Sequence, residues 1–242
     1  MRTIAIGDIH GGLKGLIQAL NRVEVRDEDT LIFMGDYMDG WSEAAQTVQF
    51  LIDLSKKFNC IFIKGNHDVS CEEWLETGEV KAKWFMHGGK ETMESYQGFS
   101  DQEKAVHLQF LKDTHIYYLD EQNRLFLHAG FTSQKGIKEE PLEENFYKDR
   151  TLWEMAVVMD KSIDKDSLLY PKRLKNYKEI YIGHTPTTNF EQDKPMNVAN
   201  VWNIDTGAAF TGKVTAMNID TKEYVQSDAL PSLYPNEKGR NK

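Results

Sequence analysis

The chain has 242 residues, of which 40% are hydrophobic, and this is enough to form the core of one large α/β domain. Its formal net charge of −9 opposes nonspecific binding to nucleic acid or to an anionic membrane, although it does not fix the charge of any single pocket. The two cysteines, Cys60 and Cys71, lack the C-x-x-C spacing of a zinc or redox site, so we expect ordinary reduced thiols.

The predicted elements begin close to the N-terminus, because the apolar run of the stretch IAIGDIHGG starts at Ile4. This leaves no room for a signal peptide, and no apolar stretch approaches the length that spans a membrane. We therefore expect a cytoplasmic protein that has no membrane partner.

Short β-branched runs alternate with helical patterns along the first part of the chain. Apolar residues recur at helical spacing after the first two runs, at Leu13, Leu16, Ile17 and Leu20 and again at Ala44, Val48, Leu51 and Ile52. Such alternation is typical of βαβ units, and it predicts an α/β fold with a largely parallel sheet covered by these helices.

Two inserts are expected in this pattern. The first, about 71–123, is helical and contains a capping box in which Ser100 is followed by Glu103. The second, about 134–178, is charged and includes DRTLWEMAVVMD, which predicts another helix. Whether the second insert is a fixed wall or a mobile lid is left open by its composition.

Strand patterns dominate the chain after Ile180. The stretches VANVWNID and KVTAMNID flank TGAAFTG, whose turn-forming residues predict a hairpin. The expected organisation is therefore a single domain over 1–226, followed by a polar and loose tail over 227–242.

Five of the predicted strands end in side chains that can bind metal ions, in the stretches IAIGDIHGG, LIFMGDYMDG, CIFIKGNHD, LFLHAGF and IYIGHTP. In open α/β sheets, functional groups gather beyond the carboxyl ends of the strands. The donors are Asp8, His10, Asp36, Asn66, His128 and His184. Oxygen and imidazole ligands without a thiolate suit Mn²⁺, Fe²⁺ or Zn²⁺. Because six donors exceed the needs of one catalytic ion, we expect two ions that share a carboxylate.

Each of these motifs has a simpler explanation when it is taken alone. An Asp-x-His after a strand is usually a surface turn, and GHT is no more specific. GNHD is more unusual, because a simple turn needs at most one of its three functional side chains. Five such motifs in this order, each after an apolar strand, make coincidence a poor explanation.

In this order, GDIHG, GDYMD, GNHD, HAG and GHTP resemble the successive motifs of the calcineurin-like metallophosphoesterases, specifically the phosphoprotein phosphatase family in its bacterial and phage form. The similarity runs from Gly7 to about Gly212, and WFMHGGKETMESY resembles a further segment of these enzymes. It implies a four-layer α/β/β/α sandwich with a dinuclear site at one end of two sheets.

The resemblance also implies a role for each donor. Asp8 and His10 would bind the first ion, Asn66, His128 and His184 would bind the second, and Asp36 would bridge them, with Mn²⁺ expected first and Fe or Zn as alternatives. Coordination lowers the pKa of water from about 15.7 to about 7, which makes a hydroxide between the ions the expected nucleophile.

Two further residues match catalytic positions of the family. His67 corresponds to the general acid that protonates the leaving oxygen, and Asp39 to the carboxylate that orients it. The simpler alternatives are a hydrogen-bonded loop histidine and a turn aspartate before Gly40.

One motif departs from the family pattern. It usually ends in Asp-Arg-Gly, whereas this chain has Asp39-Gly40-Trp41, so a charge-assisted phosphate contact of about 1.5–3 kcal/mol is missing unless another residue replaces it. Arg150 in KDRTLWE is the candidate for a remaining substrate contact, together with Asn66, although an exposed helix arginine explains Arg150 equally well. Trp41 is expected either in the core or as an apolar wall for the substrate.

These residues predict a metal-dependent phosphomonoesterase. The first hypothesis is a protein phosphatase for phosphoserine and phosphothreonine, with phosphotyrosine as a further substrate. The alternative is a nucleotide or dinucleoside polyphosphate hydrolase or phosphodiesterase, as in the related symmetrical diadenosine tetraphosphate hydrolases. A third hypothesis, a non-catalytic phosphate-binding relative, is disfavoured because all six ligands, His67 and Asp39 are present.

Overall fold

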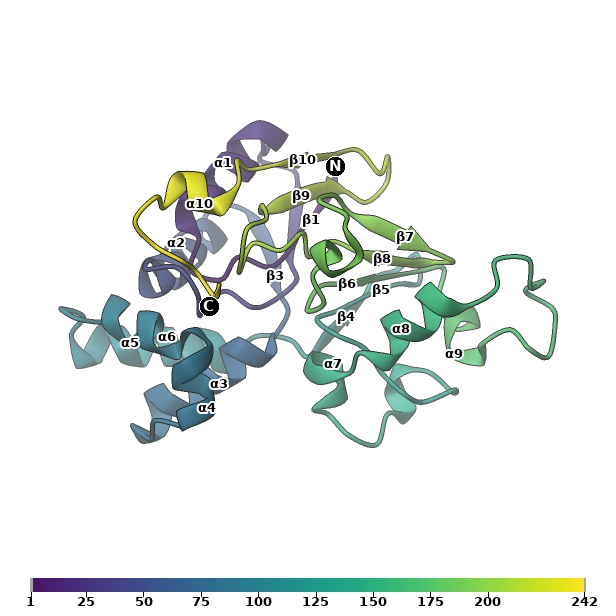
Figure 1. The fold of residues 1–242 in the computed structure, drawn as a ribbon, viewed down its shortest axis with the longest axis horizontal. Helices are drawn as coiled ribbons and strands as arrows, with labels where there is room; N and C mark the ends of the chain where they lie inside the picture. Colours follow the sequence, from purple (N-terminus) through teal and green to yellow (C-terminus); the bar gives the residue numbers. More distant parts are fainter. Residues whose placement is uncertain (1, 242) are drawn as a thin grey trace.

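The structure is a computed structural model that describes residues 2–241. Within them, two five-stranded mixed sheets are flanked by helices (Figure 1). The first sheet has the order β10-β9-β1-β2-β3, with β1 (Thr3–Ile6), β2 (Thr30–Phe33), β3 (Asn59–Phe62), β9 (Thr215–Asn218) and β10 (Tyr224–Gln226). The second has the order β4-β5-β6-β8-β7, with β4 (Tyr117–Leu119), β5 (Arg124–Leu127), β6 (Glu179–Ile182), β7 (Met196–Val198) and β8 (Val201–Asn203).

The centre of each sheet is parallel, as the alternating pattern predicts. β1, β2 and β3 pair in parallel in the first sheet, as do β5, β6 and β8 in the second, and the outer strands are antiparallel. Parallel strands place their carboxyl ends on the same side. The loops that follow them are therefore brought together at one end of each sheet.

Alternate residues of the central strands face two different cores. In β2, Leu31 and Phe33 pack under the helices, whereas Ile32 packs between the sheets. In β6, Tyr181 likewise packs between the sheets. Since side chains alternate across a strand, burial on both faces requires an uninterrupted apolar run, which is what these strands show. Three apolar cores between four layers confirm the expected α/β/β/α sandwich.

Helices cover the outer face of each sheet. The first sheet carries α1 (Leu13–Val23), α2 (Ala44–Ser55) and α10 (Leu230–Leu233), and beyond them lie α3 (Asn66–Thr77), α4 (Ala82–Trp84), α5 (Lys90–Ser95) and α6 (Asp101–Lys112). The second sheet is accompanied by α7 (Asn145–Lys148), α8 (Thr151–Val158) and α9 (Lys172–Lys175). The capping box predicted at Ser100 and Glu103 begins α6, and the predicted helix in DRTLWEMAVVMD is α8.

The hairpin predicted around TGAAFTG is wrong. Its first arm is β8, which pairs with β6 and β7 in the second sheet, and its second arm is β9, which pairs with β1 and β10 in the first. The connecting loop thus carries the chain from one sheet to the other. Turn-forming residues show where a chain changes direction, but they do not identify the strand with which the next segment pairs.

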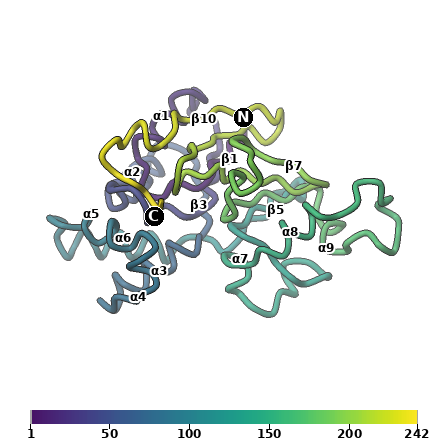
Figure 2. Tube along the Cα trace, viewed as in Figure 1, coloured from purple at the N-terminus to yellow at the C-terminus, as the bar shows by residue number. Residues whose placement is uncertain are grey.

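The C-terminal segment returns to the middle of the molecule instead of hanging loose. In Figure 2 the yellow C-terminal segment runs back to the middle of the molecule. Tyr234 is buried and its ring stacks on Trp41, with centroids 5.2 Å apart. The side chain of Glu237 accepts hydrogen bonds from Ser42. Among residues 2–241, no helix combines the length and hydrophobicity needed to cross a membrane.

Candidate metal centre

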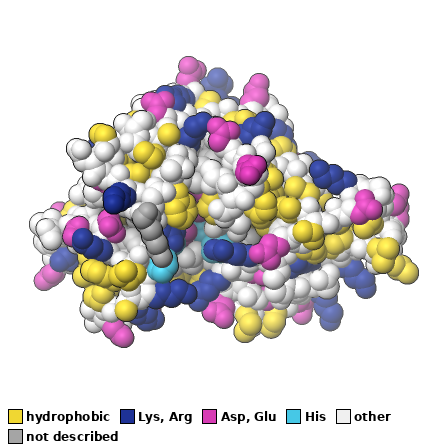
Figure 3. Space-filling view, viewed as in Figure 1, with side chains coloured by type: hydrophobic (Ala, Val, Ile, Leu, Met, Phe, Trp, Pro, Cys, Tyr) yellow, Lys and Arg dark blue, Asp and Glu magenta, His cyan; other side chains and the backbone are white. Residues whose placement is uncertain are grey.

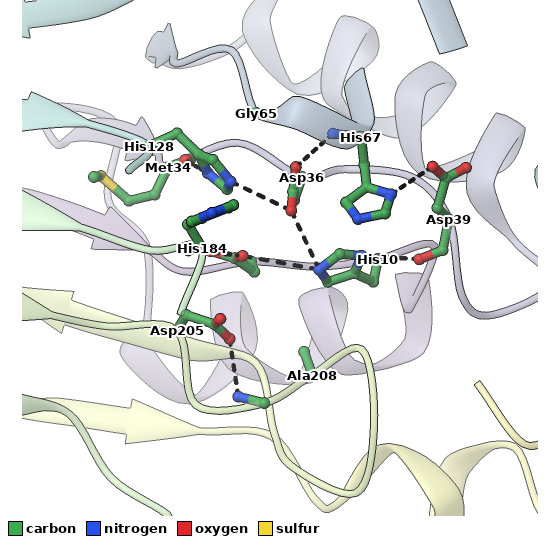
Figure 4. Close-up of polar contacts among 12 residues, drawn as sticks. His10, Met34, Asp36, Asp39, Gly65, His67, His128, His184, Asp205 and Ala208 are labelled. Atoms are coloured by element: carbon green, nitrogen blue, oxygen red, sulfur yellow. Dashed lines mark hydrogen bonds and ion pairs between the residues drawn. The ribbon is translucent and has the colours of Figure 1, made fainter. Parts of the chain in front are cut away.

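All six predicted metal ligands meet at one end of the two sheets. Figure 4 shows four of them, His10, Asp36, His128 and His184. Each follows, or begins the helix after, one of the five parallel strands that end there: Asp8 and His10 after β1, Asp36 after β2, Asn66 at the start of α3, His128 after β5, and His184 after β6. Two sets of side chains have donor atoms close enough to hold an ion. One consists of His10, Asp36 and His67, the other of Asp36, His128 and His184, so both contain Asp36.

Asp36 occupies the position of a bridging carboxylate. Its Oδ2 lies 3.5 Å from Nε2 of His10 on one side and 3.3 Å from Nε2 of His128 on the other. Asp8 Oδ2 lies 3.8 Å from the same His10 nitrogen. Two groups of donors therefore share one carboxylate, as the sequence predicts for two ions.

Backbone carbonyls orient two of the imidazoles. Nδ1 of His10 donates to the carbonyl oxygen of Asp39 at 2.8 Å, and Nδ1 of His128 donates to that of Met34 at 2.8 Å. Each Nε2 is thereby directed at Asp36, with its lone pair available to a cation. Such bonds to the second ring nitrogen commonly orient metal-binding histidines.

Two observations show that this cluster is suited to cations: its buried carboxylates and a buried imidazole nitrogen without a hydrogen-bond partner. Burial, reinforced by the charge of Asp36, raises the pKa of Asp8 to about 7. Burial also acts to raise the pKa of Asp36, but the adjacent His128 and His67 hold it well below its usual value. Nε2 of His128 is buried and makes no hydrogen bond within the described residues. A divalent cation would neutralise the carboxylates and occupy that lone pair.

The other side of the cluster joins His184, Asn66 and Arg150. Nδ1 of His184 donates to Oδ1 of Asn66 at 2.8 Å, and its Nε2 accepts from Nε of Arg150 at 3.3 Å. The structure thus places Arg150 against a predicted metal ligand. Burial lowers the pKa of His184 well below its usual value, and the positive charge of His128 lowers it further.

His67 and Asp39 form a buried pair beside Asp36. Nδ1 of His67 donates to Oδ2 of Asp39 at 2.6 Å. Asp39 also accepts from the indole of Trp84 at 2.7 Å and from the hydroxyl of Thr92 at 2.6 Å. Trp84 and Thr92 come from the segment WFMHGGKETMESY, which therefore supports the carboxylate that orients His67.

Four of these site residues have a left-handed backbone conformation. The angle φ is 54° at His10, 53° at Asp36, 67° at Asp39 and 67° at His184. This conformation is uncommon outside glycine, and it persists only where the surrounding structure enforces it, often at functional sites. The loops also pass very close to one another, since a Cβ at Gly65 would lie 2.2 Å from Oδ1 of Asp36.

Two buried carboxylates of the site are absent from the predicted set. Asp205 follows β8, and burial, with the charge of Asp8, raises its pKa to about 8. Asp68 accepts backbone N–H groups of Asp36 and Tyr37, each at 2.8 Å, and so shapes the loop that carries Asp36. The rule that identified the other residues, a polar side chain after an apolar strand, applies equally to Asp205 in VWNIDTG.

A cleft of about 540 Å³ opens from this cluster. Its basic lining residues are Lys81, Lys83, Lys148, Arg150 and Arg240, and its acidic ones are Asp36 and Glu73. Figure 3 shows Lys and Arg side chains gathered around histidines near the centre of this face.

Trp41 is fully buried and donates its indole N–H to the Ala208 carbonyl at 2.7 Å, so it belongs to the core and not to the substrate wall.

Comparisons with known proteins agree with this architecture. Asymmetrical bis(5'-nucleosyl)-tetraphosphatase PrpE of Oceanobacillus iheyensis is 24% identical over 239 residues, which cover 93% of this chain and 91% of that protein. A solved structure assigned provisionally as a diadenosine tetraphosphatase superposes with a TM-score of 0.63 at 16% identity, covering 94% of this chain and 93% of its own.

A protein serine/threonine phosphatase from Saccharomyces cerevisiae superposes with a TM-score of 0.59 at 13% identity, covering 95% of this chain and 80% of its own. Identities this low show a common fold and no more. The model of the calcineurin-like phosphoesterase family matches residues 1–208. The protein therefore belongs to the calcineurin-like phosphoesterases and is a phosphoester hydrolase.

Proposed function

We propose that this protein hydrolyses dinucleoside polyphosphates such as diadenosine tetraphosphate, using two divalent cations bound around Asp36. The observation that carries this proposal is the charge of the cleft. Five Lys and Arg side chains line it, although the chain as a whole has a net charge of −9. Several cations along one cleft suit a chain of phosphates better than a single phosphoryl group.

The comparisons support the same substrate class. The curated relatives named as tetraphosphatases match this chain over almost its whole length. The protein phosphatases among the structural neighbours share only the fold, at 13% identity. Protein phosphatase activity, the first hypothesis from the sequence, is therefore the second candidate. The arrangement of His67, Asp39 and the metal-ligand cluster is also compatible with this second activity.

In this proposal, each predicted site residue has a defined task. Asp8 and His10 would hold one cation, Asn66, His128 and His184 would hold the other, and Asp36 would be shared by both. The cations would activate water and polarise the phosphoryl group. Arg150 and Asn66, which line the cleft, contact phosphate oxygens. We expect Mn²⁺ to support activity best, with Fe²⁺ and Zn²⁺ as alternatives.

His67 supplies the proton to the leaving oxygen. Because Nδ1 of His67 donates to Asp39, Nε2 is the nitrogen that can face the substrate. Asp39 is fully buried and held by Trp84 and Thr92, so the ring of His67 has a fixed orientation. A leaving phosphate with a pKa of about 6 needs less protonation than an alkoxide, so hydrolysis of a polyphosphate depends less on this acid.

The proposal is tested with protein that has been stripped of metal and reloaded with Mn²⁺. Initial rates are measured on diadenosine tetraphosphate, a phosphoserine peptide, p-nitrophenyl phosphate and bis(p-nitrophenyl) phosphate. We expect the highest kcat/KM on diadenosine tetraphosphate, and products separated by ion-exchange chromatography should be ATP and AMP if cleavage is asymmetrical. A higher kcat/KM on the phosphopeptide would contradict this proposal and favour the second candidate.

A further inference from the structure

The site lacks an arginine in its second motif, where Gly40 follows Asp39. We infer that Arg240, in the C-terminal segment, supplies the phosphate contact that Gly40 cannot make. The inference rests on the proposed phosphoesterase site, but it does not depend on which phosphoester is the substrate. It concerns a binding residue that no strand-end motif contains.

The side chain of Arg240 runs alongside Gly40. A Cβ built on Gly40 would lie 3.5 Å from Cγ of Arg240 and 3.1 Å from the His10 carbonyl oxygen. Arg240 therefore starts next to the point from which a side chain at position 40 would leave the backbone. Its side chain reaches the cleft that Asp36, Asn66 and His67 also line.

Within residues 2–241, the side chain of Arg240 forms no hydrogen bond or ion pair, a property that it shares with the more exposed Lys83 of the same cleft. Its Nε is buried and, within residues 2–241, has no hydrogen-bond partner. The guanidinium carbon lies 5.4 Å from the ring centroid of Phe210, an aromatic contact that positions the group without using its N–H donors. By contrast, Lys81 and Lys148 form ion pairs with glutamates. A half-buried guanidinium whose N–H donors are not used within the described residues is suited to bidentate contact with phosphate oxygens.

The segment that carries Arg240 packs on Trp41, the neighbour of the position that lacks the family arginine. Trp41 stands where the family has glycine, and its ring stacks on Tyr234. The chain then crosses the indole at Gly239, where φ is 57° and a Cβ would lie 2.7 Å from Cζ2 of Trp41. The backbone N–H of Arg240 donates to the Ala209 carbonyl at 2.8 Å. Gly40, which has no side chain, leaves room for the side chain of Arg240, and Trp41 positions the segment that carries this arginine.

The test compares Arg240→Ala with Lys238→Ala, an exposed residue of the same segment, in full-length protein loaded with Mn²⁺. Binding of inorganic phosphate is measured by titration calorimetry, and kcat/KM is measured on p-nitrophenyl phosphate. We expect Arg240→Ala to weaken phosphate binding and lower kcat/KM by about 10- to 100-fold, whereas Lys238→Ala matches the wild type. Arg240→Lys keeps the charge but not the forked donors, so it should fall between the two.

Metal content and the thermal midpoint distinguish a lost contact from a disturbed fold. If the thermal midpoint of Arg240→Ala is lowered, the phosphate affinity of Arg240→Lys, which retains the aliphatic part of the side chain, is used to test the inference instead. Wild-type phosphate affinity and kcat/KM in a folded Arg240 variant would overturn this inference and leave the proposed function intact. Wild-type protein that neither binds phosphate nor hydrolyses any ester would overturn both.

Discussion

Asp36 is the residue on which the two groups of donors depend. Its carboxylate lies within 3.5 Å of one imidazole from each sheet, and its other oxygen accepts the backbone N–H of His67 at 2.9 Å. One side chain thus joins the loops after β1, β2, β3 and β5. Loss of its charge should affect both cations and not only one.

Replacing Asp36 with Asn is expected to reduce the affinity of both ions by at least about tenfold, because the bridging negative charge is lost. The measurement is metal content per chain after dialysis against Mn²⁺, by atomic emission. Asp53→Asn on the exposed face of α2 is the matched control, since it removes the same charge away from the cleft. An Asp36→Asn variant that retains two ions would rule out bridging.

His67→Asn is expected to lower kcat on an alkyl phosphate by about 10²–10⁴-fold while leaving metal content unchanged, because the leaving alkoxide loses its proton donor. The loss should be smaller on p-nitrophenyl phosphate and on diadenosine tetraphosphate, whose leaving groups are more acidic. His87→Asn, which alters another histidine of the cleft, serves as the control. Equal losses on all three substrates would remove His67 from the role of general acid.

Among single residues, the strand-end motifs predict side chains that the structure brings together, while their metal-binding and catalytic roles stay predictions. The six donors, His67 and Asp39 lie together because each strand end is a local signal. Arg240 has no such signal, since its position depends on how the C-terminal segment packs on Trp41. Asp205 is a different case, because its strand-end signal is present but it lies outside the predicted motifs.

At the scale of elements, the helical insert supports the site through buried polar contacts. Thr92 and Trp84 hold Asp39, while α6 packs against α3 and α2. Within α6, His107 is completely buried. It accepts the hydroxyl proton of Tyr96 at 3.0 Å and donates from Nε2 to Gln49 at 3.1 Å. This arrangement requires a neutral ring.

Burial of His107 predicts an acid-sensitive packing of α6. Burial lowers its pKa to about 4 in the folded protein, against about 6.5 when unfolded. Between these values the unfolded chain binds more protons, so the free energy of unfolding falls as the pH drops. Urea unfolding should show that His107→Gln loses about 1–2 kcal/mol less stability than the wild type between pH 7 and pH 5, after allowance for screening.

His115→Gln, which replaces an exposed histidine just after α6, is the control for this comparison and should match the pH dependence of the wild type. An identical pH dependence in His107→Gln would show that the buried ring does not contribute. The capping box of α6 and the presence of helix α8 follow from local sequence, and both are confirmed. The pairing of β8 and β9 depends on distant strands, which explains why local turn signals predict it wrongly.

At the scale of the whole molecule, three apolar cores hold four layers together, and the C-terminal segment joins the first of them. Tyr234 is part of the core that contains Trp41, α1 and α2, and its hydroxyl donates to Glu43. The polar composition of residues 227–242 predicts a loose tail, but Leu230 and Tyr234 are buried in this core and hold the segment against it. The division into one domain over 1–226 and a tail stays a prediction.

Tyr234→Ala is expected to cost about 3–5 kcal/mol, because it removes a buried aromatic ring from the core. The midpoint of urea unfolding and the rate of limited trypsin cleavage after Lys238 or Arg240 are the measurements. Tyr224→Ala, at a partly exposed ring of β10, should change both much less. Unchanged stability and cleavage in Tyr234→Ala would mean that the segment is loose in solution.

The left-handed backbone at His10, Asp36 and His184 has an evolutionary consequence. Apart from glycine, the residue types that most often adopt this conformation are Asn, Asp and His, which are also common donors to divalent cations. A point mutation that exchanges one of them for another leaves the loop path intact while changing the hardness of the ligand. In such a scaffold, metal preference can drift between descendants without any need to redesign the surrounding fold.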